Sequence, residues 1–133
     1  MLRYMLDTDL CIRVLRDRPA SARERFNREA RGLCISTVSL HELLYGAERS
    51  ARPDHYRVEV ARFAARLQVL AFDADAAAHA ADIRATLEKS GQAIGSYDLM
   101  IAGHARSRGL VAVTGNLREF MRVDGLRCED WLG

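Results

Sequence analysis

The chain has 133 residues, of which 20 are Lys or Arg and 18 are Asp or Glu, giving a formal net charge of +2. That length predicts one domain, residues 1–133, with a core that needs no disulfide or metal to hold it. No apolar run approaches the roughly 20 residues that span a bilayer, and the N-terminus lacks the order of a signal peptide. We therefore expect a cytoplasmic protein without membrane contacts, and the three cysteines are too far apart for a zinc knuckle.

A short apolar run, residues 2–6, ends abruptly at Asp7-Thr8-Asp9. It predicts a buried parallel strand that leads into a helix over residues 10–15. Ligands of open α/β sheets bind outside the carboxyl ends of such strands, so Asp7 is expected at a functional edge. A second helix follows Pro19, and arginines outnumber acids between residues 13 and 31, which would suit a weak phosphate-facing patch.

Residues 33–36 predict the second strand, and a helix with an apolar stripe begins around Ser39. Glu42 falls in the expected first turn of this helix. Two interpretations are open: Glu42 is an acid of a functional site, or Ser39 and Glu42 form a capping box in which Glu42 only bonds backbone. From spacing alone the capping box is the stronger interpretation.

A helix from Pro53, a third strand over residues 69–72 and an alanine-rich helix over residues 74–89 are expected next. A nearly continuous apolar helix then covers residues 97–105, with Ser96 as its expected cap. Asp98 lies in the first turn of that helix. It either stabilises the positive helix end or belongs to a site, because an unpaired carboxylate on such an apolar helix is costly.

Residues 110–113 predict the fourth strand, which ends in a polar turn as the first strand does. A short helix over residues 117–121 follows, and the tail, residues 126–132, is expected to add an edge strand or to pack on the core. The alternation of strands and helices predicts an α/β domain, with a parallel four- to five-stranded sheet flanked by helices on both faces.

Several acids follow the carboxyl ends of these strands, where they share one edge of the sheet. Carboxylates brought together repel and raise one another's pKa unless a hard cation neutralises them. Oxygen ligands of this kind suit Mg²⁺ or Mn²⁺, which can polarise a phosphodiester. The candidates are Asp7, Glu42, Asp98, Asn116 and Glu119.

Four segments that combine acids with hydroxyl residues stand at the expected strand ends and helix starts. They are residues 5–9 (MLDTD), 35–47 (ISTVSLHELLYGA), 97–102 (YDLMIA), and 113–116 (VTGN) with 118–120 (REF). In this order and at these separations they resemble the PIN-domain ribonucleases, and among them the VapC toxins of bacterial toxin–antitoxin pairs. The resemblance covers essentially the whole chain and implies a single PIN-like domain.

The resemblance implies that Asp7, Glu42 and Asp98 hold the metal. Thr8 and Thr114 would be hydroxyls that order the site, Asn116 stands where many PIN domains carry a fourth acid, and Glu119 could take that place. A salt bridge from Glu119 to Arg118 or Arg122 is the equal alternative. Two positions depart from the family: Asp9 and Gly115 both stand where asparagine is common.

The implied activity is Mg²⁺-dependent endonucleolytic cleavage of RNA, in several members of tRNA and in some of initiator tRNA. A homodimer and a VapB-like antitoxin are the implied partners.

Three other readings remain at this stage. Asp7-Thr8-Asp9 also fits a haloacid-dehalogenase-like phosphatase, although Cys11 stands where that chemistry needs threonine or valine. A non-catalytic domain of the same fold would explain Gly115 and Asn116. A DNA-directed nuclease would use the same acids and the same metal.

Overall fold

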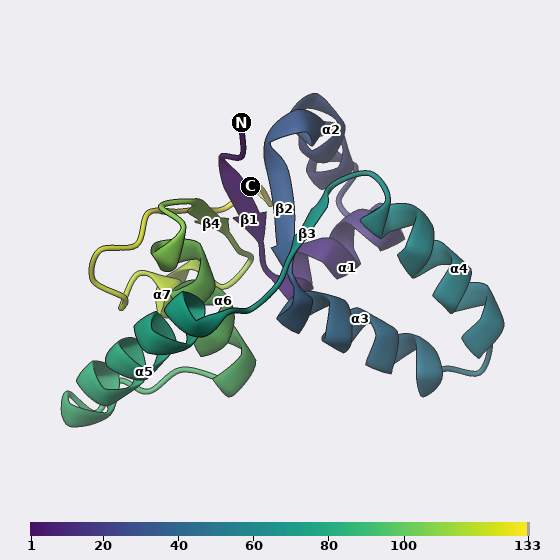
Figure 1. Cartoon of the computed structure of the whole chain (residues 1–133). Helices are drawn as coiled ribbons and strands as arrows, with labels where there is room; N and C mark the ends of the chain where they lie inside the picture. The colour runs from purple at the N-terminus through teal and green to yellow at the C-terminus, as the bar shows by residue number, and fades with distance from the viewer. Residues whose placement is uncertain (133) are drawn as a thin grey trace.

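A computed structural model describes residues 1–132 of the chain. Its centre is a five-stranded, all-parallel sheet with the strand order β3-β2-β1-β4-β5. The strands are β1 (Tyr4–Leu6), β2 (Leu33–Ser36), β3 (Gln68–Leu70), β4 (Val111–Val113) and β5 (Cys128–Glu129). The first strand therefore lies in the middle of the sheet, between β2 and β4 (Figure 1).

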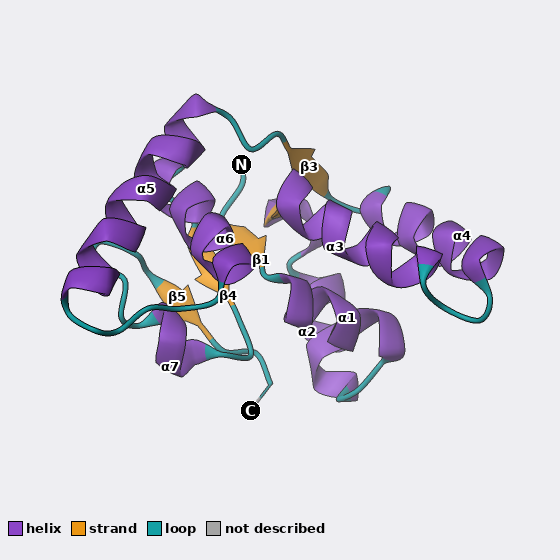
Figure 2. Cartoon of the chain, turned by 90° about the horizontal axis from the view of Figure 1, so that it is seen from below, coloured by secondary structure: helices purple, strands orange, loops and turns teal. Residues whose placement is uncertain are grey.

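Helices connect the parallel strands, as such crossovers require. One group, α1 to α4, gathers beside β2 and β3, and the other, α5 to α7, gathers beside β4 and β5 (Figures 1 and 2). The helices are α1 (Thr8–Arg16), α2 (Ala20–Arg28), α3 (Thr37–Glu48), α4 (Pro53–Ala64), α5 (Ala74–Lys89), α6 (Ser96–Ser107) and α7 (Leu117–Phe120), with a short 3₁₀ turn at Ala30–Gly32. The fold class predicted from the sequence is confirmed, with five strands.

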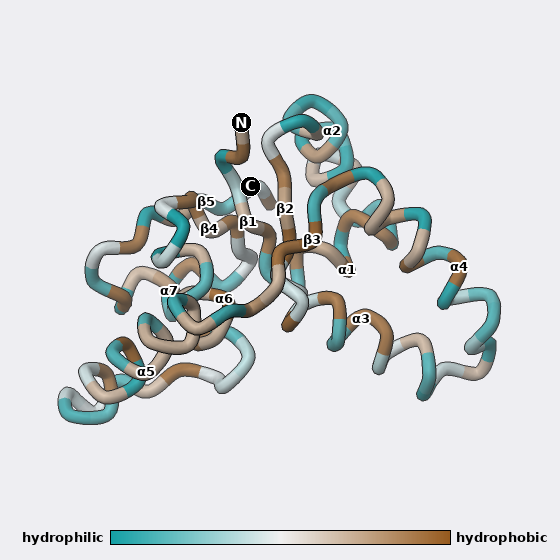
Figure 3. Tube along the Cα trace, viewed as in Figure 1, coloured by the Kyte–Doolittle hydropathy of each residue, from teal (hydrophilic) through white to brown (hydrophobic). Residues whose placement is uncertain are grey.

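The central strand β1 contributes side chains to two separate hydrophobic cores. Tyr4 and Leu6 pack on the side of α1 to α4, whereas Met5 packs on the side of α5 to α7. This division follows from the alternation of side chains along a strand. All three residues are buried, because helices cover both faces of the sheet, and the hydropathy of the chain is high along the central strands (Figure 3).

Two helix starts differ from the sequence predictions. Helix α3 begins at Thr37, and its cap is Ser36, whose hydroxyl accepts a hydrogen bond from the backbone N–H of Val38 at 3.0 Å. Helix α6 begins at Ser96, with Gly95 as the preceding cap residue. Both helices start earlier than predicted. Helix α3 follows β2 with no intervening loop, and α6 begins directly after Gly95.

The C-terminal tail does both things that the sequence allowed. Strand β5 pairs in parallel with β4, and Trp131, only 6% exposed, packs its ring against Tyr4 with 5.2 Å between the ring centroids. The tail therefore forms one edge strand of the sheet and contributes Trp131 to the core on the side of α1 to α4. Within residues 1–132, no helix has the length and apolar character needed to cross a membrane.

Candidate active site

Asp7 stands directly after the central strand and caps the following helix. Its backbone N–H donates to the Val113 carbonyl of β4 at 2.9 Å, and its Oδ1 accepts from the backbone N–H of Leu10 at 2.8 Å. The side chain is almost completely buried. The carboxyl group is thus fixed at the carboxyl edge of the sheet by two elements, β4 and α1.

Burial raises the pKa of the Asp7 carboxyl to about 7. Hydrogen bonds from the Thr114 side chain and the Leu10 N–H lower this pKa, whereas the charges of Asp98 and Asp9 raise it further. Near neutral pH this carboxyl is therefore only partly ionised in the protein alone. A cation bound nearby would favour its charged form and remove this penalty.

Asp98, half-buried in the first turn of α6, faces the same edge. Burial raises the pKa of its carboxyl, and the negative charges of Glu119 and Glu42 raise it further, while a hydrogen bond from the Asn116 side chain lowers it. If Asp98 only stabilised the positive end of the helix, other acids near it would be unfavourable, because their charges repel its carboxylate. The electrostatic environment of Asp98 therefore favours membership of a site over the dipole alternative.

Glu42 lies in the second turn of α3, and its partner is a side chain from another element. Its Oε1 accepts from the Thr8 hydroxyl at 2.5 Å, and that hydroxyl lies 3.1 Å from the buried hydroxyl of Ser39. The capping-box interpretation is wrong, because Ser36 caps the helix and Glu42 is directed toward α1. Sequence reasoning assigned Ser39 to the cap and missed its contact with Thr8, since no local signal reports a contact over 31 residues.

Asn116 and Glu119 form a pair after β4. The side-chain amide of Asn116 donates to Glu119 Oε2 at 2.6 Å, and its backbone N–H donates to the Thr114 hydroxyl at 2.8 Å. Among residues 1–132, Glu119 forms no salt bridge to Arg118 or Arg122, and Arg122 instead donates to the carbonyls of Gln92 and Ala93. The salt-bridge alternative is therefore not what the structure contains.

The acids affect one another electrostatically, but their oxygens do not converge on one point. In the described part of the chain, no group of three His, Cys, Asp or Glu side chains is close enough together to hold an ion as it stands. Repulsion between the charges opposes convergence, and Glu42 and Glu119 are tied to Thr8 and Asn116. The carboxyl edge of the sheet therefore carries several carboxylates that are near one another but do not share one central point.

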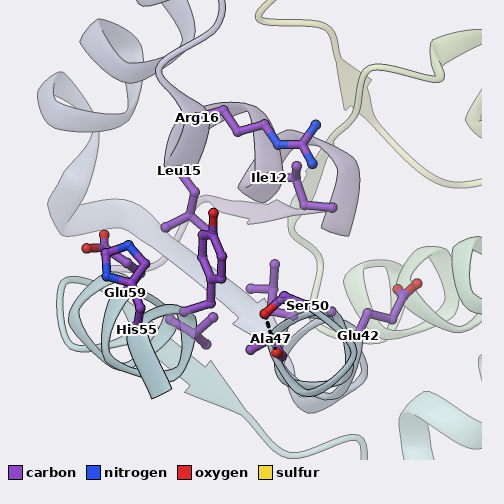
Figure 4. A pocket seen from close by; sticks show the side chains of 12 residues that line it. Ile12, Leu15, Arg16, Glu42, Ala47, Ser50, His55 and Glu59 are labelled. Carbon is purple, nitrogen blue, oxygen red and sulfur yellow. Dashed lines mark hydrogen bonds between the residues drawn. The ribbon is translucent and has the colours of Figure 1, made fainter. Parts of the chain in front are cut away.

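A hollow of about 600 Å³ lies beside this edge, between α1, α3 and α4. Its wall includes the apolar Ile12, Leu15 and Val60 together with Arg16 and Glu59. Glu42 also borders the hollow, with its carboxylate directed away from the side chains of α4 (Figure 4). The hollow and the acidic edge are therefore neighbouring features that share a residue.

The arginines between residues 13 and 31 are partly engaged within the protein. Arg13 pairs with Asp9, Arg23 pairs with Asp17, and Arg25 pairs with Glu129 while lying over the Trp131 ring. These contacts reduce the number of free guanidinium groups that a phosphate-facing patch would need.

Comparisons with known proteins agree with this architecture. The family profile of the PIN domain matches residues 4–126. The chain is 53% identical to the "tRNA(fMet)-specific endonuclease VapC" of Shigella flexneri, over 98% of this chain and 99% of that protein. It is 46% identical to "Ribonuclease VapC2" of Haemophilus influenzae, over 99% and 100% of the two chains. The crystal structure of DNA-bound VapBC from Salmonella typhimurium superposes with a TM-score of 0.94, at 52% identity over 98% of this chain and 99% of that one.

The chain therefore belongs to the PIN-domain family, and its fold is that of a PIN domain. Within that family the chain belongs to the VapC ribonucleases, the toxins of toxin–antitoxin pairs. It is an enzyme that acts on phosphodiester bonds of RNA, which excludes the phosphatase, the DNA-directed nuclease and the non-catalytic domain considered above. Nucleases of the PIN family generally depend on a divalent metal ion.

Proposed function

We propose that this protein cleaves tRNA, with tRNA(fMet) as its preferred target, and that Asp7, Asp98 and Glu42 hold a Mg²⁺ or Mn²⁺ ion for the reaction. The observation that carries the proposal is that two partly or fully buried carboxyls, Asp7 and Asp98, lie among other acids, with the charge of Asp98 acting on Asp7. The pKa of each carboxyl is raised, by burial first and then by the charges of other acids, with no cationic side chain among the causes. A site with this excess of buried negative charge fits a small divalent cation.

The remaining side chains position these acids. Thr8 holds the Glu42 carboxylate through its hydroxyl, and the side-chain amide of Asn116 holds Glu119. The charges of both glutamates act on Asp98. A bound divalent ion would supply polarisation of the phosphodiester and would stabilise charge on the leaving oxygen. Asp7, whose pKa is about 7 in the protein alone, would lose its remaining proton when the ion binds.

The choice of tRNA is supported by the relatives at 53% and 52% identity in Shigella flexneri and Salmonella typhimurium, both named for tRNA(fMet). Single-stranded loops are the parts of an RNA that proteins read most readily. The cytoplasm, where tRNA is found, is the proposed location.

The hollow between α1, α3 and α4 is the proposed contact for a VapB-like antitoxin. Its apolar wall with a few charged residues is the kind of groove that accepts one face of an amphipathic helix. Since Glu42 borders both features, an antitoxin seated there would lie beside the acidic edge and could block RNA.

The first test is cleavage of purified tRNA(fMet) and of an elongator tRNA by protein freed of antitoxin. We expect discrete fragments of tRNA(fMet) with Mg²⁺, none with EDTA, and a loss of activity of about a hundredfold or more in Asp7→Ala and Asp98→Asn, since each removes a proposed metal ligand. Full activity of Asp98→Asn would remove Asp98 from the site. Intact tRNA with a folded wild-type protein that binds Mn²⁺ would point to another RNA, whereas no binding of Mn²⁺ would contradict the metal site.

A further inference from the structure

Two buried hydroxyls, those of Thr8 and Ser39, join helices α1 and α3 beside Glu42. Their oxygens lie 3.1 Å apart, although the residues are 31 positions apart in the chain. Thr8 is 8% exposed, and Ser39 is fully buried. A hydroxyl removed from water is costly without a hydrogen-bond partner, and here each of the two is a partner of the other. The two helices therefore meet at a polar contact.

The number of hydrogens in this group fixes the direction of its hydrogen bonds. A carboxylate only accepts, and Thr8 has a single hydroxyl hydrogen, which it donates to Glu42 Oε1 at 2.5 Å. The charge of the acceptor makes this the stronger of the two bonds. The Thr8 oxygen is then left to accept, so Ser39 donates to it. The resulting chain of hydrogen bonds runs from Ser39 through Thr8 to Glu42.

Glu42 needs this support because its side chain is long and borders two different surroundings. Ordering a glutamate side chain costs conformational entropy. Glu42 lines the hollow between α1, α3 and α4, yet its carboxylate is directed away from the side chains of α4 (Figure 4). The bond from Thr8 holds this carboxylate toward α1. Since Thr8 directly follows Asp7, the same bond sets the position of Glu42 relative to Asp7.

Two simpler roles do not account for the hydroxyl of Ser39. It does not cap α3, because Ser36 does. A serine inside a helix commonly returns its hydroxyl to a carbonyl one turn earlier in the same helix, whereas the hydroxyl of Ser39 reaches another helix. If residue 39 only filled space, alanine would serve better, because it has the higher helix propensity and buries no polar group.

We propose that Ser39 is a positioning residue of the cleavage site, which acts on Glu42 through the Thr8 hydroxyl. Its hydrogen bond occupies the Thr8 oxygen and leaves the one Thr8 hydrogen directed at Glu42. The carboxylate is thereby held in one orientation before a metal ion or RNA binds, so less ordering is left for the moment of binding. This inference rests on the metal-holding role of Glu42 in the proposed function and adds the residue that orients it.

The test is the affinity of the full-length, antitoxin-free protein for Mn²⁺, measured by isothermal titration calorimetry without RNA. We expect Ser39→Ala to raise the dissociation constant about tenfold, as for other residues that orient a metal ligand. Ser107→Ala is the matched control and should bind as the wild type does, since it removes a partly buried hydroxyl that donates to the His104 carbonyl at the far end of α6. Circular dichroism would verify that each variant is folded.

A second set of variants tests whether Ser39 acts through Thr8. Thr8→Val keeps the shape of the side chain without the hydroxyl and should weaken Mn²⁺ binding at least as much as Ser39→Ala does. Thr8→Ser keeps the hydroxyl and should bind nearly as the wild type does. In the Thr8→Val background, Ser39→Ala should have no further effect. An equal loss in both backgrounds would mean that Ser39 acts by packing, and the inference would be wrong.

Glu42→Gln separates this inference from the proposed function. Wild-type protein that fails to bind Mn²⁺, or an unchanged dissociation constant in Glu42→Gln, would overturn the metal role of Glu42 and this inference with it. Weaker binding by Glu42→Gln together with unchanged binding by Ser39→Ala would overturn this inference alone, and Glu42 would remain a metal ligand.

Discussion

His104 lies in the middle of the packed side of α6 and is fully buried, and neither of its ring nitrogens has a hydrogen-bond partner among residues 1–132. Its ring stands edge-on to Phe72, with 5.6 Å between the centroids. Burial lowers the pKa of this imidazole, the charge of Asp73 raises it in part, and Arg108 lowers it. His104 is therefore neutral in the folded protein at neutral pH, and a proton would have to enter an apolar contact.

This burial predicts a pH dependence of stability. The unfolded chain binds a proton at His104 below about pH 6.5, whereas the native chain binds it only at lower pH, so the free energy of unfolding falls as pH decreases through this range, by at most about 1.4 kcal/mol per pH unit. Urea unfolding of wild type and His104→Leu between pH 4.5 and 8 would measure it. The difference between the two should change below pH 6.5 and stay constant above pH 7.5.

His55→Leu replaces an exposed histidine of α4 and serves as the matched control. A difference between wild type and His104→Leu that is the same at every pH would show that His104 titrates equally in both states.

The sequence predicted which residues lie at the edge of the sheet, but it did not predict which side chains they contact. Asp7 and Asp98 could be placed at the edge because strand ends and helix starts are visible in the pattern of apolar residues. The contact of Glu42 with Thr8 joins residues 34 positions apart and depends on how α3 packs against α1, so no local pattern reports it. The prediction of a capping box was wrong because Ser36, at the end of β2, caps α3 in place of Ser39.

Helices α5 and α6 pack closely against each other at Gly103. A Cβ on Gly103 would lie 2.7 Å from the backbone Cα and N of Ala80, so the two helices approach to a distance that only glycine allows. Asp98 stands on α6, five residues before Gly103, so this contact also fixes one acid of the site.

We predict that Gly103→Ala destabilises the protein by about 1–3 kcal/mol or more, because the added methyl group forces the two backbones apart. Gly46→Ala is the matched control, since a Cβ at Gly46 in α3 would meet no atom of the described residues within 4 Å. That change should stabilise the protein by about 0.5–1 kcal/mol through helix propensity. Thermal unfolding followed by circular dichroism would measure both, and a Gly103→Ala protein as stable as wild type would contradict the close approach.

Elements were predicted best where their ends carry strong signals. The helix expected over residues 74–89 is α5 as found, because Asp73 caps its start and Ser90-Gly91 ends it. The third strand was displaced, Gln68–Leu70 instead of residues 69–72, because β3 is a short edge strand whose side chains are largely exposed. Exposed edge strands lack the apolar pattern that marks a buried strand.

The whole molecule depends on its tail to complete the core on the side of α1 to α4. Trp131, the only tryptophan, packs against Tyr4 of the central strand and under the guanidinium group of Arg25. Its indole N–H donates to Glu129 Oε1 at 3.1 Å. Residues from the two ends of the chain thus meet beside the middle of the sheet.

Trp131→Ala should therefore lower the free energy of unfolding by about 3–5 kcal/mol, the usual cost of truncating a buried aromatic side chain. Guanidinium unfolding followed by far-ultraviolet circular dichroism would measure it. Met121→Ala, at a side chain 68% exposed, is the control and should change stability little. A loss below 1 kcal/mol in Trp131→Ala would show that the tail is not part of the core.

The strand order has a consequence for when this ribonuclease becomes active during its own synthesis. Val111 of β4 pairs with Tyr4, 107 positions earlier, and the Asp7 N–H donates to the Val113 carbonyl, so one side of the central strand has no partner until β4 has been made. Asp98 also leaves the ribosome late, while Asp7 leaves it first. Because domains fold as units once their segments are available, we expect these acids to come together only after α6 and β4 have left the ribosome. The acidic edge therefore assembles only after β4 has been made, so a partner could meet the chain before its site forms.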